Sequence, residues 1–311
     1  MTHAGFADIA ACWVCGGRQL TREHDAVLDL DVYRDQHPEL AAYTGETVWF
    51  RKCAACGFTQ PERLPALPGF FDRLYDQLWA PEWIHQEFES DYKDLIFRVI
   101  LDGLASRTTV KGRLLDVGAH AGRFIHLARQ AGWTPEGIEL NPRTASFAAT
   151  RTGLPVHATN VERMALSRQR YSAITLIDVL EHVPDPLALL SRVTGALGPE
   201  GWIAVKVPSG PAQRRKERAR AVIRRGYRAR LADNLVHVNH FSPAALRTSF
   251  ERVGLSRITV EIAPPELPST NGHRASASNL LRRSLYFCGR QLPGGVHTPL
   301  ALNLLAFGQR V

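Results

Sequence analysis

The chain has no apolar run long enough to cross a membrane and no recognisable N-terminal sorting signal. Its 311 residues contain no apolar stretch that approaches the ~20 residues a membrane span needs. Residues 1–13 (MTHAGFADIAACW) lack the basic region followed by an apolar region that marks a secretory signal peptide. These absences argue against a membrane-spanning and a secreted protein, and we expect a cytoplasmic location.

Cysteine is scarce, and its placement is more informative than its number. Four of the five cysteines form two C-x-x-C pairs, Cys12 with Cys15 and Cys53 with Cys56. Four thiolates that converge from two such turns make a closed tetrahedral zinc site. Disulfides are not expected in a cytosolic chain, and neither pair has the βαβ context of a redox motif. Residues 1–67 are therefore predicted to be a zinc ribbon whose metal stabilises the fold.

Acidic residues are outnumbered by basic ones. Thirty-eight Lys and Arg stand against 30 Asp and Glu, which gives a formal net charge of +8. This balance favours anionic partners without identifying one.

The complete dinucleotide-binding fingerprint is also missing. Residues 113–122 (RLLDVGAHAG) have the pattern of a strand, a glycine turn and the start of a helix, which opens an α/β sheet with a ligand crevice at the strand end. Residues 118–122 (GAHAG) lack the middle and last glycines of G-x-G-x-x-G. Asp116, just before the turn, would place a carboxylate near any pyrophosphate. The turn therefore suits a ligand with an amine or cationic group.

More strand ends with polar residues follow. Glu139 ends a short strand about twenty residues after the turn, where a carboxylate can accept both ribose hydroxyls of an adenosine. Residues 171–180 form a buried strand, and a further strand spans 202–207. We predict an α/β fold over residues 109–311, a Rossmann-like sheet with helices on both faces.

The segments LLDVGAHAG, GIEL, DVLEHVPDP and LGPEGWIAVKVPS resemble, in this order and spacing, the class I S-adenosylmethionine (SAM)-dependent methyltransferases. More narrowly they are similar to the group of ubiquinone O-methyltransferases and natural-product and saccharide methyltransferases. The resemblance covers about residues 113–311 and implies SAM as cofactor. His120 stands where the family usually has glycine, and it narrows the cofactor pocket. The residues that the resemblance implies for SAM binding are Asp116, Gly118, His120, Gly122, Glu139, Asn160, Asp178 and Leu180.

Two histidines are the candidate catalytic residues. The resemblance places His182 (in LEHV) and His237 (in HVNHFS) near the acceptor, and a histidine can act as general base because its ordinary pKa lies near neutrality. His182 has two alternative roles: it caps the next helix or fills a polar gap, or it holds a divalent metal. In the metal hypothesis Asp178, Glu181 and His182 match the acid-x-x-Glu-His pattern of some ubiquinone and small-RNA methyltransferases.

Two further segments are expected to shape the acceptor site. Residues 68–108 are predicted to be a helical bridge rich in aromatic residues, which packs between the domains or forms a lid. The insertion 209–233 is strongly basic and lies where related enzymes have substrate-recognition elements. As a helix it has Val222 and Ile223 on one face, which suits packing over the site. Its charges are solvated or bind an anionic acceptor or an RNA backbone.

Taken together, these features predict a SAM-dependent methyltransferase that O-methylates a small polar acceptor, a saccharide, nucleotide sugar or secondary metabolite, and that forms a homo-oligomer. One alternative is an RNA methyltransferase, although the N/D-P-P-Y type motif of base N-methylation is absent. A second is a sugar C-methyltransferase, since residues 51–65 (RKCAACGFTQPERLP) resemble a zinc knuckle of those enzymes. A third is a non-catalytic cofactor-binding scaffold.

Overall fold

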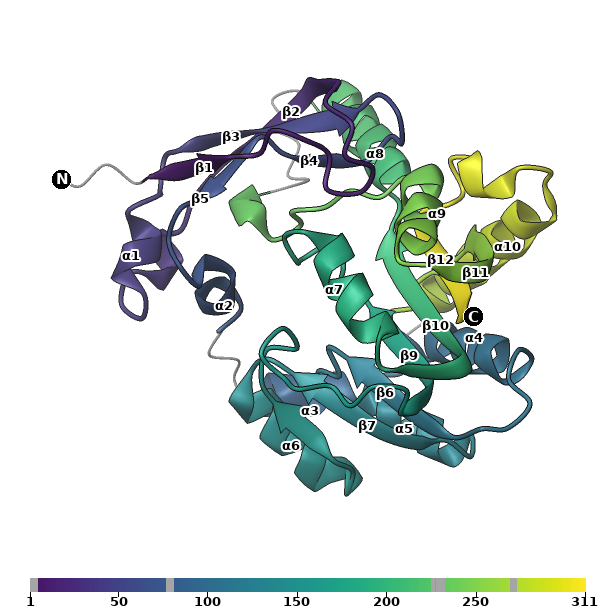
Figure 1. Cartoon of the computed structure of the whole chain (residues 1–311). Coiled ribbons are helices and arrows are strands. Elements are labelled where there is room, and N and C mark those ends of the chain that lie inside the picture. Colours follow the sequence, from purple (N-terminus) through teal and green to yellow (C-terminus); the bar gives the residue numbers. More distant parts are fainter. Residues whose placement is uncertain (1–4, 77–80, 225–226, 228–232, 269–272) are drawn as a thin grey trace.

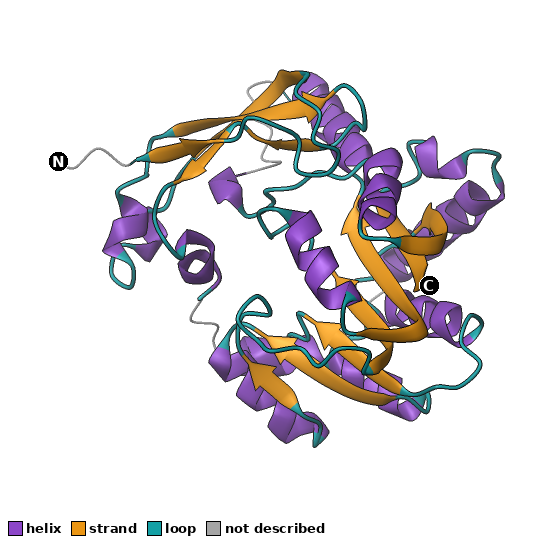
Figure 2. Cartoon of the chain, in the orientation of Figure 1, coloured by secondary structure: helices purple, strands orange, loops and turns teal. Residues whose placement is uncertain are grey.

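The computed structural model describes residues 5–76, 81–224, 227, 233–268 and 273–311, and Figures 1 and 2 show its two parts. The gaps leave residues 225–226 and 228–232, the end of the basic insertion 209–233, outside the described part. In that part no helix has both the length and the apolar character needed to span a bilayer.

A mixed seven-stranded sheet forms the core of the larger part, in the order β8-β7-β6-β9-β10-β12-β11. The five strands β8, β7, β6, β9 and β10 run parallel to one another, and β12 runs antiparallel to both β10 and β11. This confirms the predicted α/β class and its Rossmann-like sheet. The strands are β6 (Arg113–Val117), β7 (Thr134–Glu139), β8 (Val156–Ala158), β9 (Tyr171–Ile177), β10 (Leu197–Pro208), β11 (Leu255–Ile262) and β12 (Asn303–Arg310).

The strand order places a ligand crevice next to β6. From β6 the chain proceeds to β7 and β8 on one side and then returns to β9 and β10 on the other. The order therefore reverses between β6 and β9, and in open α/β sheets ligands bind at the carboxyl ends of the strands at such a point.

Helices cover both faces of this sheet, because successive strand residues point to opposite sides. Leu114 belongs to a buried cluster with α4 and α5, whereas Leu115 belongs to a cluster with α7 and α9. The helices of this part are α4 (Asp94–Ala105), α5 (Arg123–Gln130), α6 (Pro142–Thr152), α7 (Pro186–Thr194), α8 (Gly210–Ile223), α9 (Pro243–Arg252) and α10 (His273–Gln291), with short 3-10 turns at Asp233–Leu235 and Gly295–His297.

The N-terminal part consists of small sheets and short helices that pack against the core. A three-stranded sheet has the order β2-β3-β4, and β1 pairs with β5. Its elements are β1 (Phe6–Asp8), β2 (Leu20–Val27), a 3-10 turn (Asp31–Tyr33), α1 (Pro38–Ala41), β3 (Thr47–Cys53), β4 (Thr59–Pro61), β5 (Arg63–Pro65) and α2 (Phe70–Tyr75). Helix α3 (Pro81–Glu89) follows and packs against α5 of the larger part (Figure 1).

The junction between the two parts is buried and specific. The rings of Phe58 and Phe241 lie 5.0 Å apart, and the hydroxyl of Ser242 donates to the carbonyl of Cys56 at 2.7 Å. Cys56 and Phe58 belong to the same apolar cluster as the core strands. The cysteine turns are thus continuous with the main core.

The basic helix α8 packs differently from the expectation. Val222 and Ile223 are 87% and 80% exposed, so the prediction that they form its packing face is wrong. Instead Arg214 is buried and its guanidinium lies 2.9 Å from the carboxylate of Glu23 in β2. Helical periodicity showed which residues share a face, but a buried ion pair decides which face is covered.

Two buried histidines lie where the N-terminal sheet meets the core. The rings of His24 and His240 are 5.4 Å apart, and His24 stacks on Phe50 at 4.9 Å. Burial lowers the pKa of His24 to about 4 and that of His240 well below its ordinary value. Both side chains are therefore neutral in the folded protein at neutral pH.

We expect acid to weaken this junction. A histidine whose pKa is lowered by folding binds a proton more readily in the unfolded chain, so stability is complete above the ordinary pKa of ~6.5 and falls as the pH descends toward about 4. Thermal unfolding across this range should show a falling Tm. The variant His24→Phe keeps the stacked ring and does not titrate, so its Tm should fall less steeply. Equal slopes for both proteins would contradict this account.

Candidate functional site

Two adjoining cavities lie at the carboxyl ends of the parallel strands. The larger has a volume of about 720 Å³ and extends from β7 and β8 to the segment around α2. The smaller, of about 160 Å³, lies between the turn after β6 and the helices α3 and α4. Gly118 and His120 line both cavities. The two spaces therefore meet at the turn whose sequence pattern predicted a ligand crevice.

The turn after β6 depends on its glycines. Gly118 has a φ of +81°, and a Cβ there would lie 2.6 Å from the side chain of Val179. Gly122 also has a positive φ, but it lies outside both cavity linings and caps the start of α5. Asp116 lines the smaller cavity and accepts a hydrogen bond from the Thr175 hydroxyl at 2.6 Å. Burial raises the pKa of Asp116 to about 7.

Glu139 at the end of β7 and Asn160 shortly after β8 both line the larger cavity. The Glu139 carboxylate accepts hydrogen bonds from the backbone amides of His120 and Asn141, both at 2.9 Å. Burial raises the pKa of Glu139. The Asn160 side-chain amide donates to Asp72 of α2 at 2.9 Å. The structure thus places the predicted residues His120, Glu139 and Asn160 around one cavity, together with Asp72 from the N-terminal part.

Asp178, just after β9, lies between two lysines. Lys93 lies 3.0 Å from one carboxylate oxygen, and the buried Lys206 of β10 pairs with the other. Burial opposes the charge on Asp178, but the two ammonium groups outweigh it and lower its pKa. Leu180 is fully buried and lies outside both linings, with its carbonyl bound by Asn239.

The residues that could hold a divalent metal differ from the predicted set of Asp178, Glu181 and His182. Among the residues that the structure describes, Glu181, His182 and His237 have ligand atoms within 4.8 Å of one another, whereas Asp178 is outside this group because the lysines hold it. Burial, and then Asp178, raise the pKa of Glu181 well above its ordinary value. A metal would have to displace that proton, since ligands bind in their deprotonated form.

His182 lines the larger cavity, and its ring is held by hydrogen bonds. Its Nδ1 lies 2.7 Å from the carbonyl of Val236, which also accepts from the Tyr75 hydroxyl at 2.7 Å. Since a carbonyl only accepts, Nδ1 carries the proton and Nε2 keeps a lone pair. Burial lowers the pKa of His182. His237 lies outside the lining, with its ring 4.8 Å from that of His182, and burial lowers its pKa to about 4.

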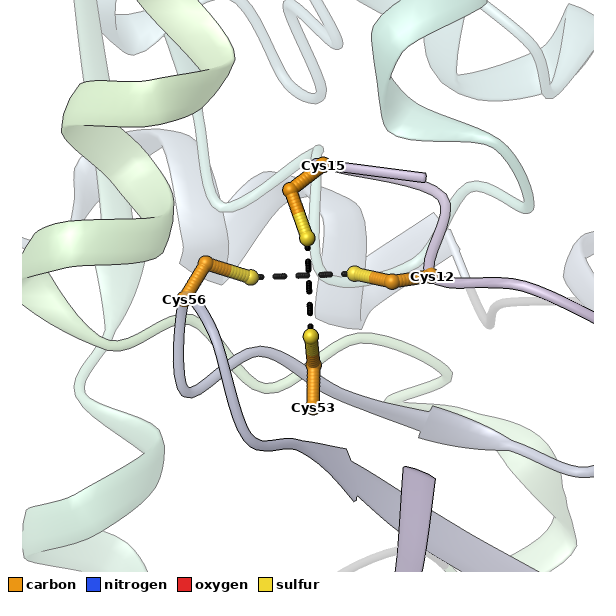
Figure 3. Close-up of side chains that lie close together, drawn as sticks. All are labelled: Cys12, Cys15, Cys53 and Cys56. Atoms are coloured by element: carbon orange, nitrogen blue, oxygen red, sulfur yellow. Dashed lines mark hydrogen bonds between the residues drawn. The ribbon is translucent and has the colours of Figure 1, made fainter. Parts of the chain in front are cut away.

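The four cysteines of the two C-x-x-C pairs converge, as Figure 3 shows. The sulfurs of Cys12 and Cys56 are 3.7 Å apart, and those of Cys15 and Cys53 are 3.5 Å apart. A tetrahedron with Zn–S bonds of ~2.3 Å has sulfurs ~3.8 Å apart. The spacing therefore fits a structural zinc ion held by four thiolates.

Several cavity residues escaped the sequence analysis. Lys206 had a visible signal, because a lysine interrupts the apolar strand WIAVKVP. Tyr75 belongs to the aromatic stretch of the predicted bridge or lid, but no pattern marked it as a partner of His182. Lys93 and Asp72 had no signal, since they reach the site only through the packing of α2 and of the loop before α4.

Comparison with known proteins gives a family match and partial relatives. Residues 86–260 match the family model described as a methyltransferase domain. The ubiquinone biosynthesis O-methyltransferase of Bordetella avium is 30% identical over 151 residues, which cover 46% of this chain and 61% of that protein. The Haemophilus ducreyi enzyme of the same name is 31% identical over 99 residues, 29% of this chain and 42% of that protein. The chain spans about half the length of these curated relatives.

The solved structures offer a more distant likeness. A SAM-dependent methyltransferase from Archaeoglobus fulgidus is 14% identical, with a TM-score of 0.49. The alignment covers 74% of this chain and 99% of that one.

Loss of the zinc site should destabilise the protein, because the cysteine turns share the main apolar core. We expect Cys53→Ser to lose bound zinc and to lower the Tm by about 10 °C or more. Cys288→Ser, at the exposed cysteine, is the matched control and should keep about one zinc ion per chain and the wild-type Tm. Unchanged metal content in the Cys53 variant, measured by elemental analysis, would refute the assignment.

Proposed function

The chain belongs to the methyltransferase-domain family, and we propose that it transfers a methyl group from SAM to a hydroxyl of a small acceptor. The observation that carries the proposal is the placement of His182. Its ring lines the large cavity next to the predicted cofactor residues, with a proton fixed on Nδ1 and a free lone pair on Nε2. A neutral imidazole in this position is equipped to accept a proton.

The two joined cavities suit the two ends of SAM. The adenosine would lie in the larger one, where Glu139 offers oxygens to the ribose and Asn160 and Asp72 line the far end. The methionine end would lie in the smaller one, beside Asp116 and Lys93. An ammonium group bound near Asp116 favours the charged form of that carboxyl, whose pKa of about 7 leaves it poised to ionise.

Charge supports this orientation of the cofactor. Lys93 and Lys206 together face a single ionised carboxylate, Asp178, and the neighbouring Glu181 is kept protonated by burial. Lys93 is partly exposed and also lies in the field of Glu266, so Asp178 is the carboxylate that both lysines share. An anionic group such as the methionine carboxylate would give Lys93 a further ionic partner.

The chain's own residues would then orient the acceptor and receive its proton. SAM supplies a methyl group already activated by its sulfonium. As the bond from the acceptor oxygen to the methyl carbon forms and the carbon–sulfur bond breaks, the hydroxyl proton passes to Nε2 of His182. Tyr75 and the Val236 carbonyl hold the ring in the required tautomer.

The acceptor side of the large cavity has an apolar wall. Phe70 and Phe71 from α2 and Val183 after β9 line it together with Tyr75 and His182. Among the expected acceptors, this wall favours a secondary metabolite or a sugar derivative with an apolar face. The RNA alternative loses one expected contact, since Arg214 of the basic insertion already pairs with Glu23.

The proposal is tested by transfer of labelled methyl groups from SAM into cell extract, divided by size and by RNase treatment. We expect label in a low-mass, RNase-resistant fraction. His182→Gln should reduce the rate by ~10²–10⁴-fold, the usual contribution of a general base. Label in a large, RNase-sensitive fraction would favour the RNA alternative.

The pH dependence and the effect of chelator separate the two roles of His182. The base must be neutral, and burial lowers its pKa, so the wild-type rate should be level above ~pH 6.5 and fall only toward acid. EDTA should leave the rate unchanged if His182 is the base. A loss of rate that Mg²⁺ restores, with the ribbon zinc retained, would instead support a metal at Glu181, His182 and His237.

Lys93 should select for the amino-acid end of the cofactor. We expect Lys93→Met to weaken binding of S-adenosylhomocysteine by about 10- to 100-fold, because its carboxylate loses an ionic partner. Methylthioadenosine lacks that end, so its affinity should stay within about twofold. Calorimetric titration of both ligands, with the exposed Lys216→Met as control, measures the difference. Equal losses for both ligands would contradict this role, whereas no binding of either to the wild type would overturn the proposed function.

A further inference from the structure

Helix α10 leaves a set of large apolar side chains uncovered. Leu280, Leu281, Leu285 and Phe287 are between 43% and 67% exposed. At 3.6 residues per turn they fall on one side of the helix, within an arc of about 160°. Ser284 and Cys288 share this arc. Scattered apolar residues on a surface are ordinary, but four large exposed apolar side chains gathered on one side of a helix are typical of an interaction site.

The opposite side of α10 already has its partner within the fold. Tyr286 is buried, and Gly289 lies so close to β11 that a Cβ there would be 3.1 Å from the side chain of Ile262. Figure 1 shows α10 beside β11, on the side of the molecule away from α1 and α2. The helix is therefore anchored by one side and presents the apolar side outward.

Basic residues predominate around this helix, and Arg290 near its end pairs with Glu261 of β11 at 3.2 Å. After Glu266 the sequence contains no Asp or Glu up to Val311. Arg282 and Arg283 are exposed and flank the apolar side, and Arg282 is steadied by a hydrogen bond to the carbonyl of Glu266. An exposed apolar stripe flanked by Arg282 and Arg283, with the nearby Glu261 already paired with Arg290, fits a surface that is both apolar and anionic.

We infer that α10 docks the protein on an anionic membrane surface, where it lies flat with Leu280, Leu281, Leu285 and Phe287 (the apolar stripe) in the interface and its arginines at the lipid headgroups. A second copy of the chain is a poorer occupant, because two arginine-flanked surfaces on molecules of charge +8 repel each other. Nucleic acid would satisfy the arginines but would leave the leucines and the phenylalanine in water. This inference is independent of the acceptor and of methyl transfer.

Sedimentation of the full chain with lipid vesicles tests the inference. We expect binding to vesicles that contain phosphatidylglycerol and little binding to vesicles of phosphatidylcholine alone. The triple variant Leu280→Ser, Leu281→Ser, Phe287→Ser should weaken the binding by at least about tenfold, because it removes most of the buried apolar area. The double variant Arg282→Gln, Arg283→Gln should weaken it as well and reduce its dependence on salt.

A matched control removes exposed apolar side chains elsewhere. Val222 and Ile223 on α8 are more exposed than the stripe, so Val222→Ser, Ile223→Ser should bind vesicles like the wild type. All variants change exposed positions and should keep the wild-type Tm. Equal losses in stripe and control variants, no binding of the wild type to anionic vesicles, or a dimer in light scattering that the triple variant abolishes would each overturn the inference.

Discussion

One extended segment, residues 236–242, connects the parts on which the site depends. Val236 fixes the ring of His182, Asn239 binds the turn after β9 through its side chain, and His240 exchanges backbone hydrogen bonds with Thr59 of β4. The segment thus fastens the sheet that carries Cys53, the candidate base and the carboxyl end of β9 to one another. Because each of these contacts is buried or nearly so, a shift of the N-terminal sheet would also move the ring of His182 and the turn after β9.

The charged side chains in the crevice affect ligand binding through their protonation states. The free protein keeps Asp178 ionised between Lys93 and Lys206 and keeps Glu181 protonated. The two ammonium groups therefore share one ionised carboxylate at the crevice. Binding of a zwitterionic ligand would then change the protonation of the site as well as fill it, which links cofactor affinity to pH through Asp116.

The sequence predicted the parts of the site that are encoded locally. Gly118 and Asp178 directly follow a strand and Glu139 is the last residue of one, so one stretch of chain reveals both the strand and the residue at its end. Lys93 comes from a segment whose position depends on tertiary packing, and no local pattern marks it, whereas Tyr75 lies in the aromatic stretch that was predicted to form a bridge or lid. The packing of α8 was mispredicted for the same reason, since the partner of a helix face is a property of the whole fold.

One wall of the larger cavity is formed by α2 and the end of β5, which lie outside the large sheet. The residues expected to hold the cofactor sit on the strands of the large sheet, whereas Phe70, Phe71 and Tyr75 belong to the N-terminal part. Mutation of this wall can therefore alter which acceptor is admitted while the residues for the methyl donor stay intact. An N-terminal module of this kind would allow the acceptor side of the cavity to change without loss of the residues expected to bind the cofactor.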